Sequence, residues 1–255
     1  MKIELPPSSI IAVCFVLFIS AMHLLGGINQ RQLIKKQQSE KGLKIERPKP
    51  SLGFSILITQ ISLILFLIVS YKNGWNFTSV GLKFEIFPII SLIVGSICYI
   101  LFTFGLIIIL KILKLLEATE DDTYRVMLRL TPRQKLPKIL FLIGVCIFNP
   151  ITEELMFRGI LVHQLGLFIN NHLLAIALGL FINLGNHIYQ GKLQIATHII
   201  FYLIAIALLY SPFGLIGAIG FHFAGDIYPF ISLKRSAINY RNRIRNKRAV
   251  KDTSN

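Results

Sequence analysis

Five long stretches of this sequence contain no Lys, Arg, Asp or Glu, and this absence constrains the fold more than any other feature. A helix that crosses the hydrocarbon core of a bilayer needs about 20 apolar residues, and each stretch can provide them. Charged residues make up 15% of the chain, whereas a soluble domain has about 25%. The sequence therefore predicts a polytopic membrane protein. The stretches are Leu5–Gln30, Ser51–Tyr71, Ile86–Leu110, Gly159–Gly191 and Leu193–Gly225.

Breaks at Gly, Asn and Pro divide the two longest stretches, so we predict an all-α membrane bundle of about seven transmembrane helices. Isolated strands cannot satisfy their backbone groups in lipid, and no alternating pattern of about ten residues suggests a barrel. The shorter apolar run Ile139–Thr152 leads into a charged cluster and is assigned to the fourth helix. The helices are expected near residues 8–26, 52–71, 86–110, 139–165, 172–190, 194–210 and 213–232.

The net charge of +15 is concentrated in three segments rather than spread along the chain. Lys and Arg gather in residues 31–49, 125–135 and 234–251, which all fall on one side of the membrane if there are seven spans. The positive-inside rule then places the C-terminus in the cytosol and the N-terminus outside. We therefore interpret the positive charge as membrane orientation, with the lipid bilayer and not a nucleic acid as the partner.

A few ionisable residues interrupt the apolar runs, although a charged side chain at the bilayer centre costs about 2.5–3.5 kcal/mol. Glu153, Glu154 and Arg158 lie within residues 149–159, and His187 and Asp226 lie in or beside later runs. Polar pairs can serve only to hold helices together, at about 0.6 kcal/mol on average. Two adjacent acids, an arginine and two histidines on helices together favour a functional site, because intramembrane ionisable residues are functional candidates by default.

Helical spacing sorts these residues into pairs. Glu154 and Arg158 are four residues apart and share one helix face, in the favourable order for neutralising each other. Glu153 lies about 100° around the helix from Glu154, so Arg158 is less well placed to neutralise its charge. A carboxylate without a compensating charge in a low dielectric is a stronger base than one in water, so Glu153 is the candidate general base. The same spacing defines two further pairs: His222 with Asp226, and Asn183 with His187.

Other chemistries fit the sequence badly. It contains no HExxH zinc motif, no GxSxG and no Walker A sequence. Gly225–Asp226 matches half of a GxGD aspartyl site, but Phe223 occupies the first glycine position. Asp226 is also the only aspartate in any expected span, which excludes a mechanism with two aspartates.

The segment Glu153–Glu154–Leu155–Met156–Phe157–Arg158 resembles EExxxR, the first motif of the CAAX protease and bacteriocin-processing family, also called Abi. His222–Phe223–Ala224–Gly225–Asp226 resembles its last motif, HxxxN or HxxxD, whereas the middle motif FxxxH is matched only by His187, with Asn183 in place of Phe. The resemblance implies a catalytic core at residues 136–233, between N-terminal transmembrane helices with cytosolic loops (1–135) and a basic cytosolic tail (234–255).

The resemblance also implies a glutamate-dependent intramembrane endopeptidase, a hydrolase. Glu153 and His187 would hold and activate the water, and Glu154 would pair with Arg158 and support Glu153. His222 and Asp226 would form the side that stabilises the oxyanion. An ionised Asp accepts hydrogen bonds rather than donating them, so Asp226 instead orients His222 or is protonated. The motifs lack a convincing zinc shell, and we predict that no metal or other cofactor is required.

The substrate and the activity stay open at this point. The family implies a peptide or protein substrate at the membrane, which is a prenylated CAAX tail in eukaryotic and archaeal relatives. In bacterial relatives it is a peptide pheromone or leader, and a Lys- and Ile-rich composition like this one looks bacterial. The first alternative is a non-proteolytic bacteriocin self-immunity or scaffold protein that keeps the residues for folding. A proton-coupled transporter would show repeated halves, and none is found. The oligomeric state is not indicated.

One expectation concerns depth in the membrane. If the fourth helix starts at Pro137, Glu153 lies about 24 Å along it, whereas His187 lies far along a helix that runs the opposite way. Straight, perpendicular helices would place the two residues at different depths. Either Pro150 breaks the helix, tilt corrects the offset, or the expected starts are wrong.

Overall fold

The computed structural model describes residues 77–117, 131–132, 134–187 and 192–253, with scattered positions between 10 and 25 and between 57 and 68. This described part consists of helices joined by turns and contains no β-strand, so the predicted all-α class is confirmed. Four helices are long and apolar enough to cross a membrane, and a fifth apolar helix is shorter. The first two expected spans lie largely outside the described residues, so the count of seven stays a prediction.

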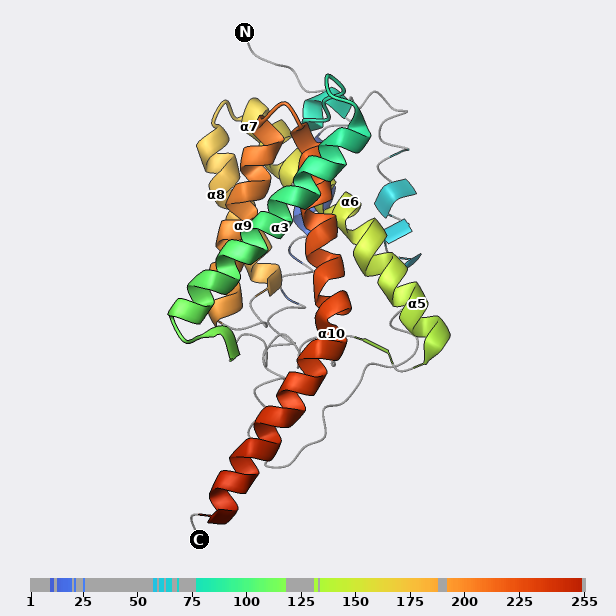
Figure 1. Ribbon diagram of the computed structural model, residues 1–255. Helices are drawn as coiled ribbons and strands as arrows, with labels where there is room; N and C mark the ends of the chain where they lie inside the picture. The colour runs from blue at the N-terminus through green and yellow to red at the C-terminus, as the bar shows by residue number, and fades with distance from the viewer. Residues whose placement is uncertain are drawn as a thin grey trace.

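From α5 onward the helices follow one another with short connections (Figure 1). A short 3-10 helix, η1, precedes the long helix α3, and an unbroken helical run in five parts follows it. The run is succeeded by α8, α9 and α10. Their bounds are η1 Phe77–Val80, α3 Pro88–Ile112, α5 Lys135–Ile143, η2 Gly144–Phe148, α6 Asn149–Glu153, η3 Glu154–Gln164, α7 Leu165–Phe168, α8 His172–His187, α9 Lys192–Tyr210 and α10 Gly214–Thr253.

The third to sixth expected spans coincide with α3, the run from α5 to α7, α8 and α9 to within a few residues. The seventh expected span, 213–232, coincides with the apolar part of α10, Gly214–Ser232. The backbone of α10 continues beyond this span as a helix through the basic segment to Thr253. In Figure 1 this extension projects well beyond the rest of the bundle.

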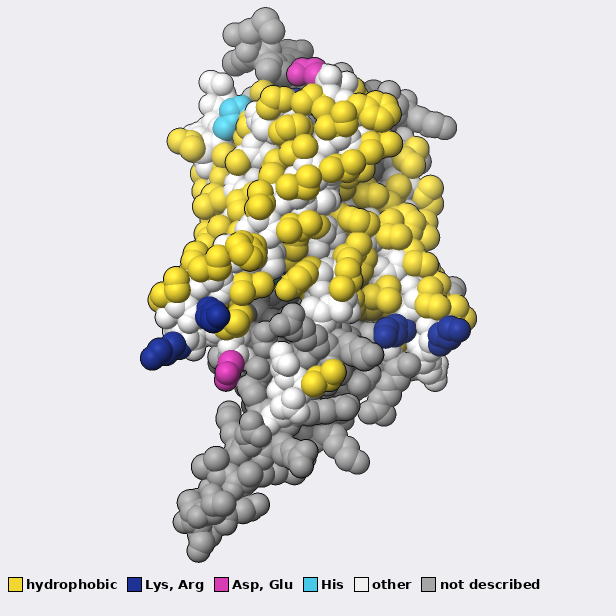
Figure 2. All heavy atoms as spheres, viewed as in Figure 1, with side chains coloured by type: hydrophobic (Ala, Val, Ile, Leu, Met, Phe, Trp, Pro, Cys, Tyr) yellow, Lys and Arg dark blue, Asp and Glu magenta, His cyan; other side chains and the backbone are white. Residues whose placement is uncertain are grey.

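Apolar side chains form a belt around the outside of the bundle. Figure 2 shows hydrophobic groups covering the middle of the molecule, with Lys and Arg gathered at one end of the belt. On α3, Ile100, Leu101 and Phe104 are 62%, 64% and 65% exposed. An exposed apolar surface of this extent fits a bundle that is surrounded by lipid.

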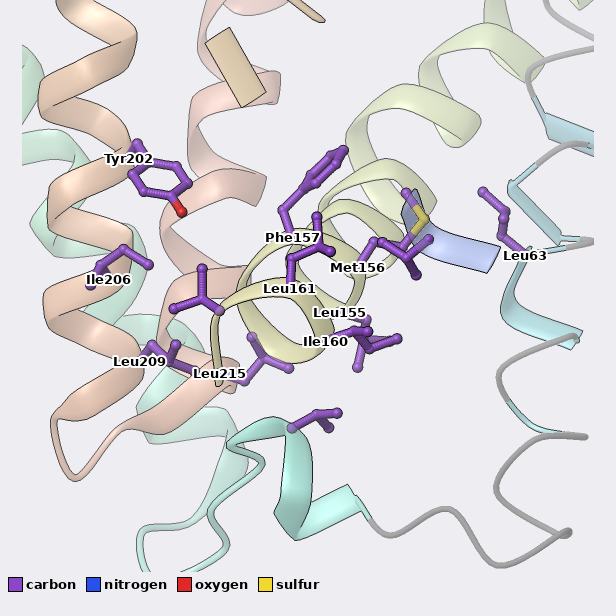
Figure 3. Close-up of a cluster of buried hydrophobic side chains, with 13 residues drawn as sticks. Leu63, Leu155, Met156, Phe157, Ile160, Leu161, Tyr202, Ile206, Leu209 and Leu215 are labelled. Carbon is purple, nitrogen blue, oxygen red and sulfur yellow. The ribbon is translucent and has the colours of Figure 1, made fainter. Parts of the chain in front are cut away.

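The core is built around η3. All of its residues except His163 are buried, and α8, α9 and α10 pack against it. In Figure 3, Phe157 and Leu161 of η3 lie close to Tyr202 and Ile206 of α9. A helix that is enclosed in this way brings its polar residues into the interior as well.

Two parts of the long run are π-helical, so that their hydrogen bonds reach back five residues instead of four. The Asn149 N–H donates to the Gly144 carbonyl directly before Pro150. Proline lacks an N–H and its ring clashes with the preceding turn of an α-helix, and the wider π turn accommodates both effects. The helical run therefore continues through Pro150 without a break. It starts at Lys135, two residues before the expected start, and α5 runs obliquely in Figure 1.

α3 and α10 approach each other closely at two glycines. A Cβ added at Gly95 would collide with the Gly217 carbonyl oxygen, and one added at Gly220 would collide with the Leu92 carbonyl oxygen. Small residues at such positions let the backbones of membrane helices pack directly on each other. This packing fixes α10, and with it the polar residues that α10 carries.

Gly95→Ala is expected to lower the free energy of unfolding by about 1–3 kcal/mol, because the new methyl group overpacks a backbone contact. Gly105→Ala on the same helix is the matched control, since its Cβ would meet nothing within 4 Å. It should leave stability unchanged or raise it by up to about 1 kcal/mol, through helix propensity. Thermal unfolding of the two purified variants in detergent measures the difference. Equal melting temperatures would contradict the close packing of α3 on α10.

Candidate active site

Five of the six predicted site residues gather where α6, η3 and α10 meet, and the sixth, His187, lies on α8. Glu153 is the last residue of α6, and Glu154 is the first residue of η3, with Arg158 one turn further along. His222 and Asp226 lie one turn apart on α10. The two motifs are separated by more than sixty residues, and the fold brings them into contact.

Glu154 is the centre of a buried ion pair. Its Oε1 lies 3.1 Å from Nη1 of Arg158, and the two side chains are 0% and 1% exposed, so the contact predicted by their spacing is confirmed. The same oxygen accepts a hydrogen bond of 2.7 Å from Nδ1 of His222. The Arg158 Cζ also lies 4.7 Å from the centroid of the Tyr202 ring, a cation–π contact. The carboxylate and the guanidinium are therefore each held by two partners inside the bundle.

The second ring nitrogen of His222 faces two further acids. Because Nδ1 donates to Glu154, Nε2 is the nitrogen left for other groups. It lies 3.5 Å from Asp226 Oδ2 and 3.8 Å from Glu153 Oε2. The Asp226 and Glu153 side chains are 23% and 16% exposed, so they are the acids that a substrate or water can reach. Across the described ranges, no three or more His, Cys, Asp or Glu side chains are arranged to hold a metal ion.

His187, at the end of α8, lies against α9. Its ring packs on the ring of His198 with 4.0 Å between centroids. His198 donates from Nδ1 to the Gln194 carbonyl at 2.9 Å. The ring of Phe201 is 6.2 Å from His198 and 5.5 Å from His222, and so lies between the two histidines. That Glu153 and His187 bind one water molecule together stays a prediction.

Sequence reasoning missed several polar neighbours of the site. Asn149 donates from Nδ2 to Asp226 Oδ2 at 3.5 Å, and it is itself bonded to Gln60. His198 and Tyr202 reach the site from α9. A signal for Gln60 was present, because a polar amide inside an apolar stretch is a candidate for contacts between helices. His198 and Tyr202 are four residues apart, which is the spacing that sorted the other pairs.

An apolar cavity of about 500 Å³ lies among α3, η2, α6 and α10. Ile93 and Ile147 in its wall are 53% and 46% exposed, so it opens onto the outer surface of the bundle. Two of its lining residues are close in sequence to the acids and the histidine: Ile151 precedes Glu153 by two residues, and Phe223 follows His222. The hydroxyl of Ser96 in its wall donates to the carbonyl oxygens of Leu92 and Gly220, so its hydrogen bond is made within the protein. The cavity is therefore suited to an apolar group. The lining residues are Ile89, Leu92, Ile93, Ser96, Ile97, Ile147, Ile151, Ile219 and Phe223.

Residues 135–228 match the sequence profile of a family described as Type II CAAX prenyl endopeptidase Rce1-like. The matched segment starts with α5 and ends in α10 just after Asp226, so it includes every predicted site residue. No curated protein and no solved structure matches the chain. Residues 135–228 therefore match a domain of this family, which confirms the resemblance seen in the motifs. Together with the apolar helices, this makes the chain a multi-pass membrane protein.

Proposed function

We propose that this protein is an intramembrane endopeptidase that cleaves a peptide or protein near the membrane surface with a water molecule activated by Glu153 and His187. One observation supports this most directly. Glu153, Glu154 and Asp226 converge on the single imidazole of His222, and a buried cation holds one of these acids in place. A site that served only to join helices would not need three carboxyl groups around one ring.

The reaction runs through an addition and an elimination. Glu153 takes a proton from the water, and the resulting hydroxide attacks the scissile carbonyl carbon. The carbonyl oxygen becomes an oxyanion, to which His222 donates from Nε2. When the tetrahedral intermediate collapses, the C–N bond breaks and Glu153 returns its proton to the leaving amine. The products are a carboxylate and an amine, and no cofactor takes part.

The remaining site residues orient the His222 ring or balance the charge beside it. Glu154 fixes the His222 ring by accepting from Nδ1 at 2.7 Å, which leaves Nε2 toward Glu153 and the substrate. Arg158 balances the charge of Glu154. Asp226 lies beside Nε2 and orients it. This role fits an ionised Asp, which can accept a hydrogen bond but cannot donate one to an oxyanion.

The apolar cavity lined by Ile151 and Phe223 supports an apolar substrate group. A lipid chain or a large apolar side chain would fit a space of about 500 Å³, which lies within the range of ligand pockets, about 300–1,000 Å³. The family description names CAAX prenyl endopeptidases, so the first probes are an internally quenched farnesylated CAAX peptide and its unprenylated twin. Cleavage of both at equal rates would favour a peptide substrate without a lipid.

The proposed orientation places the basic end of the bundle in the cytosol. The end of α3 carries Lys111 and Lys114, and the start of α5 carries Lys135 and Lys138. The positive-inside rule assigns these lysines to the cytosolic side, together with the other basic segments of the sequence. The C-terminus is then cytosolic and the N-terminus outside.

The proposed function is tested by comparing peptides in the membrane fraction of wild-type cells and of cells carrying Glu153→Ala. The expected result is that a membrane-associated precursor accumulates in the variant and that its shorter product disappears. An unchanged peptide profile, with the variant inserted at normal levels, would instead favour the non-proteolytic immunity or scaffold protein.

A further inference from the structure

A chain of polar side chains runs from the second apolar stretch of the sequence to Asp226. The chain consists of Thr152, Gln60 and Asn149, and we call it the amide relay after its two amide side chains. Gln60 is 8% exposed and Thr152 0%. We propose that Gln60 and Asn149 are positioning residues of the active site, which hold Asp226 so that it orients His222. This inference rests on the proposed function and extends it to residues outside the motifs.

Each contact of the amide relay is specific. Thr152 donates from its hydroxyl to Gln60 Oε1. Gln60 donates from Nε2 to Asn149 Oδ1 at 3.0 Å. Asn149 in turn donates from Nδ2 to Asp226 Oδ2 at 3.5 Å. The carbonyl oxygens of Phe148 and Asn149 lie 3.1 Å from the Thr152 oxygen and are alternative acceptors for its one proton.

The amide relay has a direction. A side-chain amide has one end that accepts and one end that donates, so a partner at one end determines what the other end presents. An ionised Asp226 carboxylate only accepts, so it takes the NH₂ group of Asn149, and Asn149 Oδ1 then accepts from Gln60 Nε2. Gln60 Oε1 is left for the Thr152 hydroxyl. If both amides were turned over, the Asn149 oxygen would face the Asp226 oxygen, which is repulsive for an ionised acid. The direction of the amide relay is therefore the one that an ionised Asp226 requires.

The acceptor oxygen is also the one that faces the histidine. Asp226 Oδ2 lies 3.5 Å from Asn149 Nδ2 and 3.5 Å from His222 Nε2. A shift of Asn149 thus moves the carboxylate against the ring, and it changes how Nε2 faces Glu153 Oε2, now 3.8 Å away. Gln60 and Asn149 do not touch the proposed reacting atoms, so they act through Asp226.

Asn149→Asp tests this inference, because it replaces the donor with a second carboxyl group of the same shape. We expect kcat on the quenched peptide to fall about 10- to 100-fold, as when a catalytic group is displaced by about an ångström, with KM little changed. Gln60→Leu should lower kcat in the same direction. Both variants should keep the melting temperature of the wild type, because neither removes a group that contacts the buried ion pair of Glu154 and Arg158.

The control is Asn171→Asp, which makes the same change of charge at the start of α8. Asn171 accepts from the Leu174 N–H at 3.0 Å there, and Asp caps a helix equally well, so kcat should stay that of the wild type.

Two results would overturn the inference. The first is a wild-type kcat in Asn149→Asp. The second is a loss of kcat in Asn149→Asp and Gln60→Leu with both variants melting early, because the amide relay would then be structural only. Wild-type turnover in Glu153→Gln would instead overturn the proposed function, so the two failures can be told apart.

Discussion

Glu153→Gln should lower the rate of peptide cleavage by the purified protein about 100- to 10,000-fold, which is the usual contribution of a general base. Glutamine has the shape of glutamate and can still bind the water, but it cannot take the proton. The side chain is 16% exposed, so it is accessible to water while most of its surface is packed. The measurement is the initial rate on the quenched peptides in proteoliposomes, with thermal unfolding recorded on the same preparation.

Glu85→Gln is the matched control for this prediction. Glu85 is exposed and lies in the segment before α3, so the variant loses the same charge without touching the site, and it should cleave at the wild-type rate. If Glu153→Gln also cleaves at that rate, Glu153 is not the base. If both variants are slow and melt early, the loss reflects folding and the assignment fails as well.

The helices were predictable from the sequence wherever a single physical property decides them. The starts and ends of α3, α8 and α9 follow from the length of uncharged apolar sequence, because a charge inside the bilayer is costly. The contact between Glu154 and Arg158 was predictable for a similar reason. It depends only on the spacing within one helix.

Features that depend on distant residues were not predictable. Pro150 indicates a helix break when it is considered alone, and only the preceding π turn of η2 shows how the helix continues. Glu153 was expected to be poorly compensated because Arg158 points elsewhere, yet His222 of α10 supplies a nitrogen 3.8 Å away. The hydrogen bond between Gln60 and Asn149 joins residues 89 positions apart. No local pattern in the sequence encodes that pairing, since it is determined by how the helices pack.

The end of α10 shows a different limit. The change from apolar to basic sequence near Leu233 marks where the helix leaves the lipid, and the expected span stopped there. The composition of a helix indicates whether lipid or water surrounds it, but it does not indicate where the helix ends. Lys and Arg are good helix formers, so the backbone continues as a helix after the apolar segment ends.

Arg158→Met should lower the free energy of unfolding by about 3–5 kcal/mol, because it leaves one charge of a buried pair without its partner. The guanidinium is 1% exposed and the Glu154 carboxylate 0%, so water cannot replace the lost interaction. His222 would still donate to Glu154, so the carboxylate keeps one of its two partners and loses the other. Lys111→Met, near the end of α3, is the matched control and should change stability by less than about 0.5 kcal/mol.

The double variant Glu154→Gln with Arg158→Met separates the charge from the shape of this pair. Gln keeps an oxygen that can accept from His222 Nδ1, and it needs no cation. The double variant should therefore regain most of the stability that Arg158→Met loses, since removing both charges of a buried pair is often neutral. The coupling between the two substitutions, obtained from the four melting curves, measures the interaction itself. If the double variant is as unstable as Arg158→Met, then Arg158 stabilises the bundle through its contact with Tyr202 and not through Glu154.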